Sequence, residues 1–428
     1  LELVELEVRE LVPGRQRLAW RVTEDAFGAP LRLPLLVVRG AEDGPVVGLT
    51  AAIHGDELNG IRVVHRLFEE LDPSTLRGTV VMAAVTILTG FAASTREHED
   101  GTDLNRIMPG SATGTAAEQY AHRLLDGLIR RFDHHFDLHT ASFGRVNSYY
   151  IRADLTDPAV RPLALVSHAD IVLHNVGGDG TLRLAAARLG VPSLTYELGD
   201  PGVFQESMIV RGLAGVRGGL HVLGLTAEAP PEPPRPATIC LRSRWLYTSR
   251  GGLLDVLPGT AESFREGDII ATITDLYGRV VETVRAPEDG VVIGKATNPV
   301  GPAGSRILHY GVVGEAPGLR ADPLGAGVER RLPGAGALLQ GRAHAEPLRH
   351  DHHERADRRV RPLERHDHGQ ARPRRPDDGR RTGQRHAAPD RREERRRGRR
   401  LRGTQRPRRL HLPLLPLHTL RDTGQRRA

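Results

Sequence analysis

Lysine is nearly absent from this chain, since Lys295 is the only one among 428 residues. Cysteine is equally scarce: Cys240 stands alone, which excludes an internal disulfide and a zinc site built on several cysteine thiolates. No apolar run approaches the about 18 residues of a membrane span, and the N-terminal LELVELEVRE lacks the basic-then-apolar pattern of a signal peptide. We therefore expect a cytoplasmic protein. The first residue is Leu1 rather than Met, which leaves the true start open.

The formal net charge of +7 averages two unlike segments. Residues 1–315 hold 30 basic and 39 acidic side chains, whereas residues 316–428 hold 30 arginines and 14 acidic side chains. Such asymmetry is typical of a tail that binds nucleic acid or a membrane. Residues 316–428, however, contain no Phe, Tyr or Trp for stacking on bases and mix acidic residues throughout.

A second hypothesis explains the arginine-rich tail better. The scarcity of lysine indicates a GC-rich coding sequence, and a shifted reading frame in such a sequence yields Arg, Pro, Gly, Ala and His. We expect residues 316–428 to be either frameshifted or disordered, because their apolar content is too low to offset the chain entropy lost on folding. Nucleic-acid binding through this tail is the alternative.

The rest of the chain alternates apolar strands with amphipathic helices. This pattern predicts an α/β fold with a mainly parallel mixed sheet and helices on both faces. We expect strands at Leu3–Leu11, Leu31–Val38, Val46–Ile53, Gly78–Val85, His134–His139, Asp170–His174 and Pro192–Tyr196, and helices at 58–67, Ala116–Phe132 and Thr181–Leu189.

The Pro-rich stretch Ala227–Thr238 has the composition of a linker. Beyond it, short strands separated by Gly turns predict a small β-barrel or β-sandwich. We therefore divide the chain into a catalytic α/β domain (1–226), a linker (227–238), a small β-domain (239–315) and the arginine-rich tail (316–428).

Three side chains suited to zinc follow predicted strands. His54 and Glu57 lie in the turn after Val46–Ile53, and His139 ends the strand His134–His139. Catalytic zinc takes three protein ligands, commonly His and Glu, and keeps a position for water. A lone H-x-x-E arises often by chance, so the pair needs the third ligand. We expect His134 and His135 to be surface or packing residues, whereas Asp137 could orient a ligand histidine.

Other polar residues near strand ends could supply the remaining chemistry. Glu197, after an apolar strand, could take a proton from water made acidic by the metal. Asn105 and Arg106 suit a substrate carboxylate, because guanidinium and carboxylate form two parallel hydrogen bonds. Arg96 could stabilise an oxyanion. The alternative interpretation is a solvated loop arginine.

The segments HGDELNG, GTDLNRIMPG, DLHTASFGRVNS and YELGD, in this order, resemble the succinylglutamate desuccinylase/aspartoacylase family of zinc carboxypeptidase-like amidohydrolases. The resemblance covers residues 1–315 and implies a lipoyl-like β-domain. One departure is Thr86–Gly90, where family members commonly have an Asn-Pro pair.

The resemblance implies a role for each candidate residue. His54, Glu57 and His139 would bind one zinc ion per chain, and Glu197 would be the general base. Asn105 and Arg106 would hold a substrate carboxylate, and Arg96 would polarise the carbonyl.

These assignments predict a zinc-dependent deacylase that cleaves the amide bond of a small N-acyl amino acid, with no membrane partner. They leave open whether the protein is a monomer or a homo-oligomer. A carboxypeptidase acting on short peptides is the rival within enzymes. A metal-free binding module is disfavoured, because all three ligands and Glu197 are present.

Overall fold

The computed structural model describes residues 2, 3, 5–229, 231–233 and 235–315. Both hypotheses for the tail of residues 316–428 lie outside the described residues. Among the described helices, none has the length and apolar character needed to cross a membrane.

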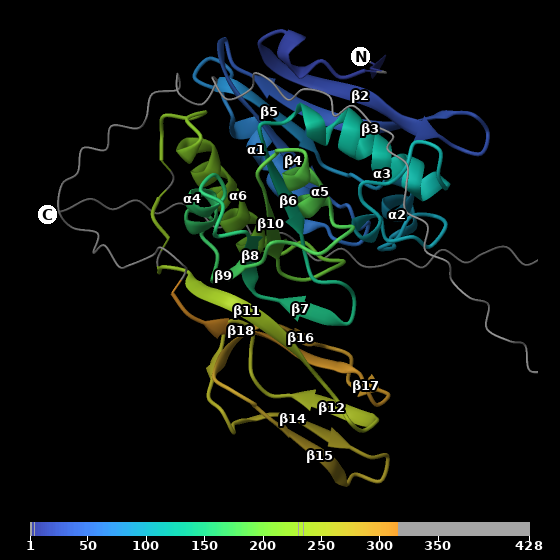
Figure 1. Cartoon of the computed structure of the whole chain (residues 1–428), viewed down its shortest axis with the longest axis vertical. Helices are drawn as coiled ribbons and strands as arrows, with labels where there is room; N and C mark the ends of the chain where they lie inside the picture. Colours follow the sequence, from blue (N-terminus) through green and yellow to red (C-terminus); the bar gives the residue numbers. More distant parts are fainter. Residues whose placement is uncertain (1, 4, 230, 234, 316–428) are drawn as a thin grey trace, which may run out of the picture. The chain divides into compact units, whose positions relative to one another are not determined.

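One mixed sheet of 14 strands organises the described chain (Figure 1). Its strands lie in the order β1-β2-β3-β5-β4-β6-β10-β8-β9-β11-β18-β16-β13, and β7 pairs with β16. The central strands β5, β4, β6 and β10 are parallel, so their carboxyl ends meet at one edge. The bounds are β1 Glu2–Leu3, β2 Gly14–Glu24, β3 Pro30–Arg39, β4 Glu42–Ala51, β5 Arg77–Ala83, β6 His134–His139, β7 Arg145–Asn147, β8 Tyr149–Ala153, β9 Ile171–His174, β10 Ser193–Leu198, β11 Thr238–Tyr247, β13 Ser263–Phe264, β16 Gly290–Ala296 and β18 Arg306–Val313.

Helices cover both faces of the central strands, as the alternating pattern predicts. Helices α1 (Asn59–Glu70), α4 (Arg161–Leu165) and α6 (Glu206–Val222) share one apolar core with Phe136 and Leu138 of β6. Helices α3 (Ala116–Gly127) and α5 (Leu182–Arg188) share a second core with Val46 of β4. The short helix α2 (Leu88–Ala93) follows β5, in a segment for which no helix was predicted.

The predicted strand Leu3–Leu11 is wrong. β1 spans Glu2–Leu3, and a short 3₁₀ helix occupies Val8–Glu10. The position beside β3 is taken by β2, in which Leu18, Trp20 and Val22 alternate toward the core. The alternating apolar residues of β2 include a tryptophan, so this strand buries more apolar surface than the alternating residues of Leu3–Leu11 could bury.

Helix α6 was not predicted, because its glycines lower helix propensity. The structure shows why they are tolerated. A Cβ added to Gly215 would lie 2.1 Å from the carbonyl oxygen of Ser167, and one added to Gly219 would lie 2.7 Å from Cζ of Phe136. Close packing of α6 on the sheet therefore requires glycine at these positions.

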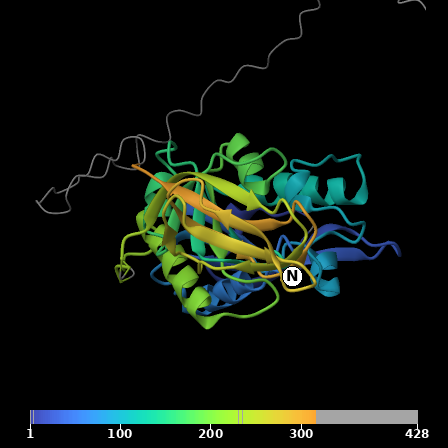
Figure 2. The ribbon, with the colours of Figure 1, turned by 90° about the horizontal axis from the view of Figure 1, so that it is seen from below.

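The strands after the Pro-rich stretch form an all-β region, drawn in yellow and orange (Figures 1 and 2). β11 first pairs with β9 of the main sheet and then with β18, so this region continues that sheet. A separate four-stranded sheet has the order β15-β14-β12-β17. Its bounds are β12 Gly252–Val256, β14 Ile269–Thr274, β15 Val280–Arg285 and β17 Val300–Gly301.

Candidate metal centre and substrate pocket

The turn between β4 and α1 carries two of the three candidate metal ligands. β4 ends at Ala51, and His54 and Glu57 lie in the turn before α1 begins at Asn59. Gly55 allows the turn to pack tightly, because a Cβ there would lie 2.2 Å from the carbonyl carbon of Gly90. Packing against this neighbour holds both candidate ligands in place.

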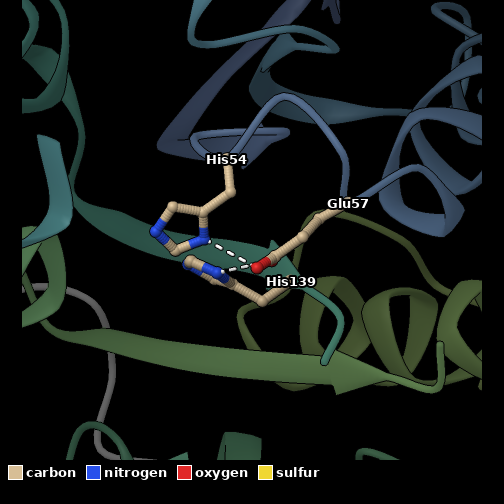
Figure 3. A group of neighbouring side chains, drawn as sticks. All are labelled: His54, Glu57 and His139. Atoms are coloured by element: carbon tan, nitrogen blue, oxygen red, sulfur yellow. Dashed lines mark hydrogen bonds and ion pairs between the residues drawn. The ribbon is translucent and has the colours of Figure 1, made fainter. Parts of the chain in front are cut away.

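The third candidate, His139, ends β6 beside this turn. Nδ1 of His54 lies 2.7 Å from Oε1 of Glu57, and Nδ1 of His139 lies 2.9 Å from Oε2 of the same carboxylate. Figure 3 shows both imidazole rings turned toward Glu57. One ligand atom from each of the three buried residues lies within 4.8 Å of the others, so the cluster could hold a metal ion.

A carboxylate contacts the outer nitrogen of each histidine. Nε2 of His54 lies 3.2 Å from Oδ1 of Asp103, and Nε2 of His139 lies 2.8 Å from Oδ2 of Asp137. Burial alone would raise the pKa of Asp137, but the nearby His139 outweighs it and brings the pKa to about 2. Both carboxylates therefore accept hydrogen bonds from the imidazoles at neutral pH.

The donor set supports a bound cation on chemical grounds. If each Nε2–H donates to its carboxylate, each Nδ1 directs a lone pair toward Glu57, which is itself an acceptor. Acceptors this close need protons or a cation between them. Burial acts to raise the pKa of Glu57, yet His54 and His139 hold it well below its usual range. Two imidazole nitrogens and one carboxylate, each ring backed by a carboxylate, are a fitting ligand set for a divalent metal.

Glu197 lies on the strand next to His139. In the parallel pairing of β10 with β6, Glu197 stands opposite His139. Its side chain is buried and accepts hydrogen bonds from Nε of Arg152 at 3.0 Å and from Nδ2 of Asn147 at 3.1 Å. The structure thus brings Glu197 to the wall of the pocket that holds the ligand cluster.

Arg96 contacts the ligand cluster directly. It donates to Oε1 of Glu57 at 3.0 Å, to Oδ2 of Asp103 at 3.0 and 3.1 Å, and to the hydroxyl of Ser142 at 2.8 Å. Burial acts to lower its pKa, but the two carboxylates outweigh this effect. The guanidinium ties the loop containing Asp103 to the turn containing Glu57.

Asn105 and Arg106 both line the pocket but differ in their contacts. Oδ1 of Asn105 accepts the backbone N–H of Leu182 at 2.7 Å, in the first turn of α5. The exposed guanidinium of Arg106 donates to the carbonyl oxygen of Asn105 at 2.7 Å. Asn105 therefore positions α5 as well as lining the cavity, and Arg106 offers further donors to a ligand.

The cavity has a volume of about 410 Å³, and several of its walls were missed from the sequence. Trp245 from β11 and His309 from β18 stack with ring centroids 4.6 Å apart and planes 6° apart. They come from the all-β region, far along the chain, and no motif marks them. Other polar lining residues were also given no role: Arg145 and Asn147 lie within the segment DLHTASFGRVNS, whereas Tyr150, Arg152 and Arg183 lie outside the quoted segments.

His135 is not a surface residue; of the two roles predicted for it, the structure shows packing. It is completely buried and hydrogen-bonded on both ring nitrogens, to Thr50 and to Ser193 at 2.8 Å each. His134 is partly buried at the start of β6. The alternation of β6 places His135 on the same face as Asp137 and His139, and that alternation is the signal by which it could have been found.

The part of the chain that carries the candidate residues is similar to known proteins. The sequence profile described as "Succinylglutamate desuccinylase/Aspartoacylase catalytic domain" matches residues 43–223, which include every candidate site residue. The curated N-alpha-acetyl-L-2,4-diaminobutyric acid deacetylase of Halomonas elongata is 25% identical over 302 residues, covering 68% of this chain and 88% of that protein.

Solved structures share the fold. The succinylglutamate desuccinylase/aspartoacylase from Rhodobacter sphaeroides matches with a TM-score of 0.66 and 23% identity, covering 73% of this chain and 98% of that one. The product-bound ectoine utilization protein EutE (DoeB) from Ruegeria pomeroyi matches with a TM-score of 0.65 and 21% identity, covering 71% and 97%. The profile match assigns residues 43–223 to the catalytic domain of the succinylglutamate desuccinylase/aspartoacylase family, and the solved structures share its fold.

Proposed function

We propose that this protein is a zinc-dependent deacylase that hydrolyses the amide bond of a small N-acyl amino acid. The observation that carries the proposal is the convergence of His54, Glu57 and His139 at the wall of a cavity that also contains Glu197. The relative from Halomonas elongata, named as a deacetylase of an N-acetylated amino acid, supports the same class of reaction.

His54, Glu57 and His139 would hold the zinc ion. When bound in such a site, zinc acts as a Lewis acid on a carbonyl and lowers the pKa of water to about 7. Asp103 and Asp137 would keep the two histidines in the tautomer that directs Nδ1 toward the ion, since each carboxylate accepts the Nε2–H.

Glu197 would move the protons of the reaction. Its carboxylate takes a proton from the attacking water and passes it to the nitrogen of the leaving amine. Arg152 and Asn147 fix both oxygens of Glu197, so its position beside His139 is set before substrate binds. A preorganised carboxylate of this kind needs little rearrangement during the reaction.

The charges of the cavity favour an anionic substrate. Within the described part of the chain, Arg106, Arg145 and Arg183 line the cavity without an ion pair to a carboxylate. Burial lowers the pKa of Arg183 to about 10, so it keeps its charge at pH 7. We propose that Arg106, with Asn105, binds the α-carboxylate, and that the positive charge of Arg145 and Arg183 favours a second acidic group.

The size of the cavity favours a small substrate over a peptide. Trp245 and His309 close one wall, and the volume of about 410 Å³ lies at the small end of ligand pockets. A carboxypeptidase acting on short peptides would need room for residues on both sides of the scissile bond.

The test combines metal analysis with a substrate panel on the full chain. Zinc content is measured by mass spectrometry, and hydrolysis is measured for N-acetyl and N-succinyl derivatives of acidic, neutral and basic amino acids and for dipeptides. We expect one zinc per chain and the highest kcat/KM for an acidic N-acyl amino acid. Absence of zinc, or faster cleavage of dipeptides than of every acyl amino acid, would contradict the proposal.

A further inference from the structure

A row of buried polar side chains lies behind His139. Thr50, His135 and Asp137 are at most 1% exposed, and Ser193 is 4% exposed. In the parallel pairing of the strands, Thr50 of β4 stands opposite Asp137 of β6, and Ser193 of β10 stands opposite His135. Polar groups buried in a sheet are costly unless hydrogen-bonded, so the partners in this row decide what it does.

The row is a continuous chain of hydrogen bonds. Oγ1 of Thr50 donates to Oδ1 of Asp137 at 2.6 Å and lies 2.8 Å from Nε2 of His135. Nδ1 of His135 lies 2.8 Å from the hydroxyl of Ser193. At the other end, Oδ2 of Asp137 lies 2.8 Å from Nε2 of His139. Both oxygens of Asp137 are therefore engaged.

The proton count sets the direction of every bond in this chain. The single proton of the Thr50 hydroxyl goes to Asp137, so His135 must donate its Nε2–H to Thr50. A neutral His135 then accepts at Nδ1, and the Ser193 hydroxyl donates to it. Asp137, which accepts from Thr50 on one oxygen, accepts the Nε2–H of His139 on the other.

We propose that Thr50 and His135 are positioning residues that hold Asp137, and through it fix the tautomer and orientation with which His139 faces the metal site. This inference rests on the metal site of the proposed function. Neither residue touches the ligand atoms Nδ1 of His139 or the Glu57 carboxylate, so their effect passes through Asp137.

Packing holds the His135 ring in the orientation that the chain of bonds requires. The ring of Phe132 stacks on it with centroids 6.1 Å apart and planes 25° apart. Phe132 in turn fills the space above Gly48, where a Cβ would lie 1.9 Å from Cδ2 of the ring. Burial lowers the pKa of His135 to about 4 despite the nearby Asp137 carboxylate, so the ring stays neutral, with one donor and one acceptor.

The main test is the zinc affinity of Thr50→Val, measured by competition with a chromogenic chelator. Valine keeps the shape of threonine but removes the donor to Asp137. We expect about tenfold weaker zinc binding, the lower end of the 10–100-fold effects seen when a partner of a ligating histidine is lost. Thr50→Ser restores the hydroxyl, so its affinity should return to within about twofold of wild type on the same reasoning. The d–d absorption of the cobalt-substituted protein should change in Thr50→Val and recover in Thr50→Ser.

Thr86→Val is the matched control. Thr86 is also fully buried, and its hydroxyl donates to the carbonyl oxygen of Ala51 at 2.8 Å outside this row. It should lower the melting temperature as Thr50→Val does while leaving zinc affinity unchanged. Wild-type zinc affinity in a destabilised Thr50→Val would mean that the row serves strand packing alone, and the inference would be wrong.

A second measurement uses wild-type protein, so it does not depend on whether a Thr50 variant folds. In zinc-loaded wild-type protein labelled with ¹⁵N-histidine, the His135 signals, assigned by their loss in His135→Gln, should report the neutral tautomer protonated at Nε2. Protonation at Nδ1, or at both nitrogens, would overturn the inference. A wild-type protein that binds no zinc would instead refute the proposed function, so the two failures are distinguishable.

Discussion

Replacing Glu197 by Gln tests the central step of the proposed reaction. Gln keeps an acceptor for Nε of Arg152, 3.0 Å away, and Asn147 can turn its amide to present oxygen to the new NH₂ group. The variant loses a charge beside the partly buried guanidinium of Arg152, which should cost about 1–3 kcal/mol of folding free energy. The protein should therefore remain folded and keep its metal, because Glu197 is not among the three ligands.

The rate should fall far more than the stability. A general acid–base group contributes roughly 10²–10⁴-fold, which is about 2.7–5.4 kcal/mol of transition-state stabilisation. We expect that loss in kcat with little change in KM, measured on the best substrate of the panel. In Glu197→Ala, which leaves a hole beside His139, added formate should restore part of the rate.

Two controls separate proton transfer from a structural role. Glu206→Gln makes the same chemical change at a more exposed residue of α6, one that pairs with Arg66 of α1, and should leave kcat unchanged. Zinc content and melting temperature are measured for each variant. A Glu197→Gln enzyme that is folded, zinc-loaded and within a few-fold of wild type would show that the base lies elsewhere.

Four further predictions concern the metal, the substrate, pH and the tail. His54→Ala and His139→Ala should each lose zinc and activity together, because two protein ligands rarely retain the ion; stoichiometric zinc in either variant would contradict the ligand set. Arg106→Lys should raise KM for a substrate with a free carboxylate much more than for its amide, since lysine lacks the forked donor geometry of arginine. Equal changes in the two KM values would argue against a contact between Arg106 and the substrate carboxylate. Burial lowers the pKa of His135 to about 4, so below pH 6.5 the unfolded chain binds a proton at this residue that the folded chain excludes. The free energy of unfolding should therefore fall by about 3 kcal/mol between pH 6.5 and pH 4 because of His135 alone. Denaturant unfolding of His135→Gln should show a smaller fall over the same pH range. Removing residues 316–428 should leave zinc content and kcat unchanged, because all the described residues that line the cavity precede 316. Salt-dependent DNA binding that is lost on truncation would favour the nucleic-acid hypothesis instead.

Local patterns in the sequence were enough to predict which strand ends carry the candidate site residues. A buried strand is a short apolar run and a turn is a short polar one, so the carboxyl ends of β4, β6 and β10 could be located from neighbouring residues alone. Because parallel strands share an edge, His54, Glu57, His139 and Glu197 were predicted to converge, and the structure brings them together. The family resemblance rests on those same local segments.

Features that depend on distant contacts could not be read in this way. The strand beside β3 was misplaced, since the choice between Leu3–Leu11 and Gly14–Glu24 is decided by how well each segment packs beside β3. Helix α6 was missed, because helix propensity counts its glycines as unfavourable and cannot see the carbonyl of Ser167 against which Gly215 packs.

The sequence by itself determined which side chains gather at the carboxyl edge of the sheet, because strand ends and the residues that follow them are set by local periodicity. Only the tertiary structure decided what surrounds them. Trp245 and His309 reach the cavity from strands more than a hundred residues after His139, and His135 acquires its partners from β4 and β10. Hydrogen-bond direction, burial and charge compensation depend on neighbours in space, which chain order does not specify.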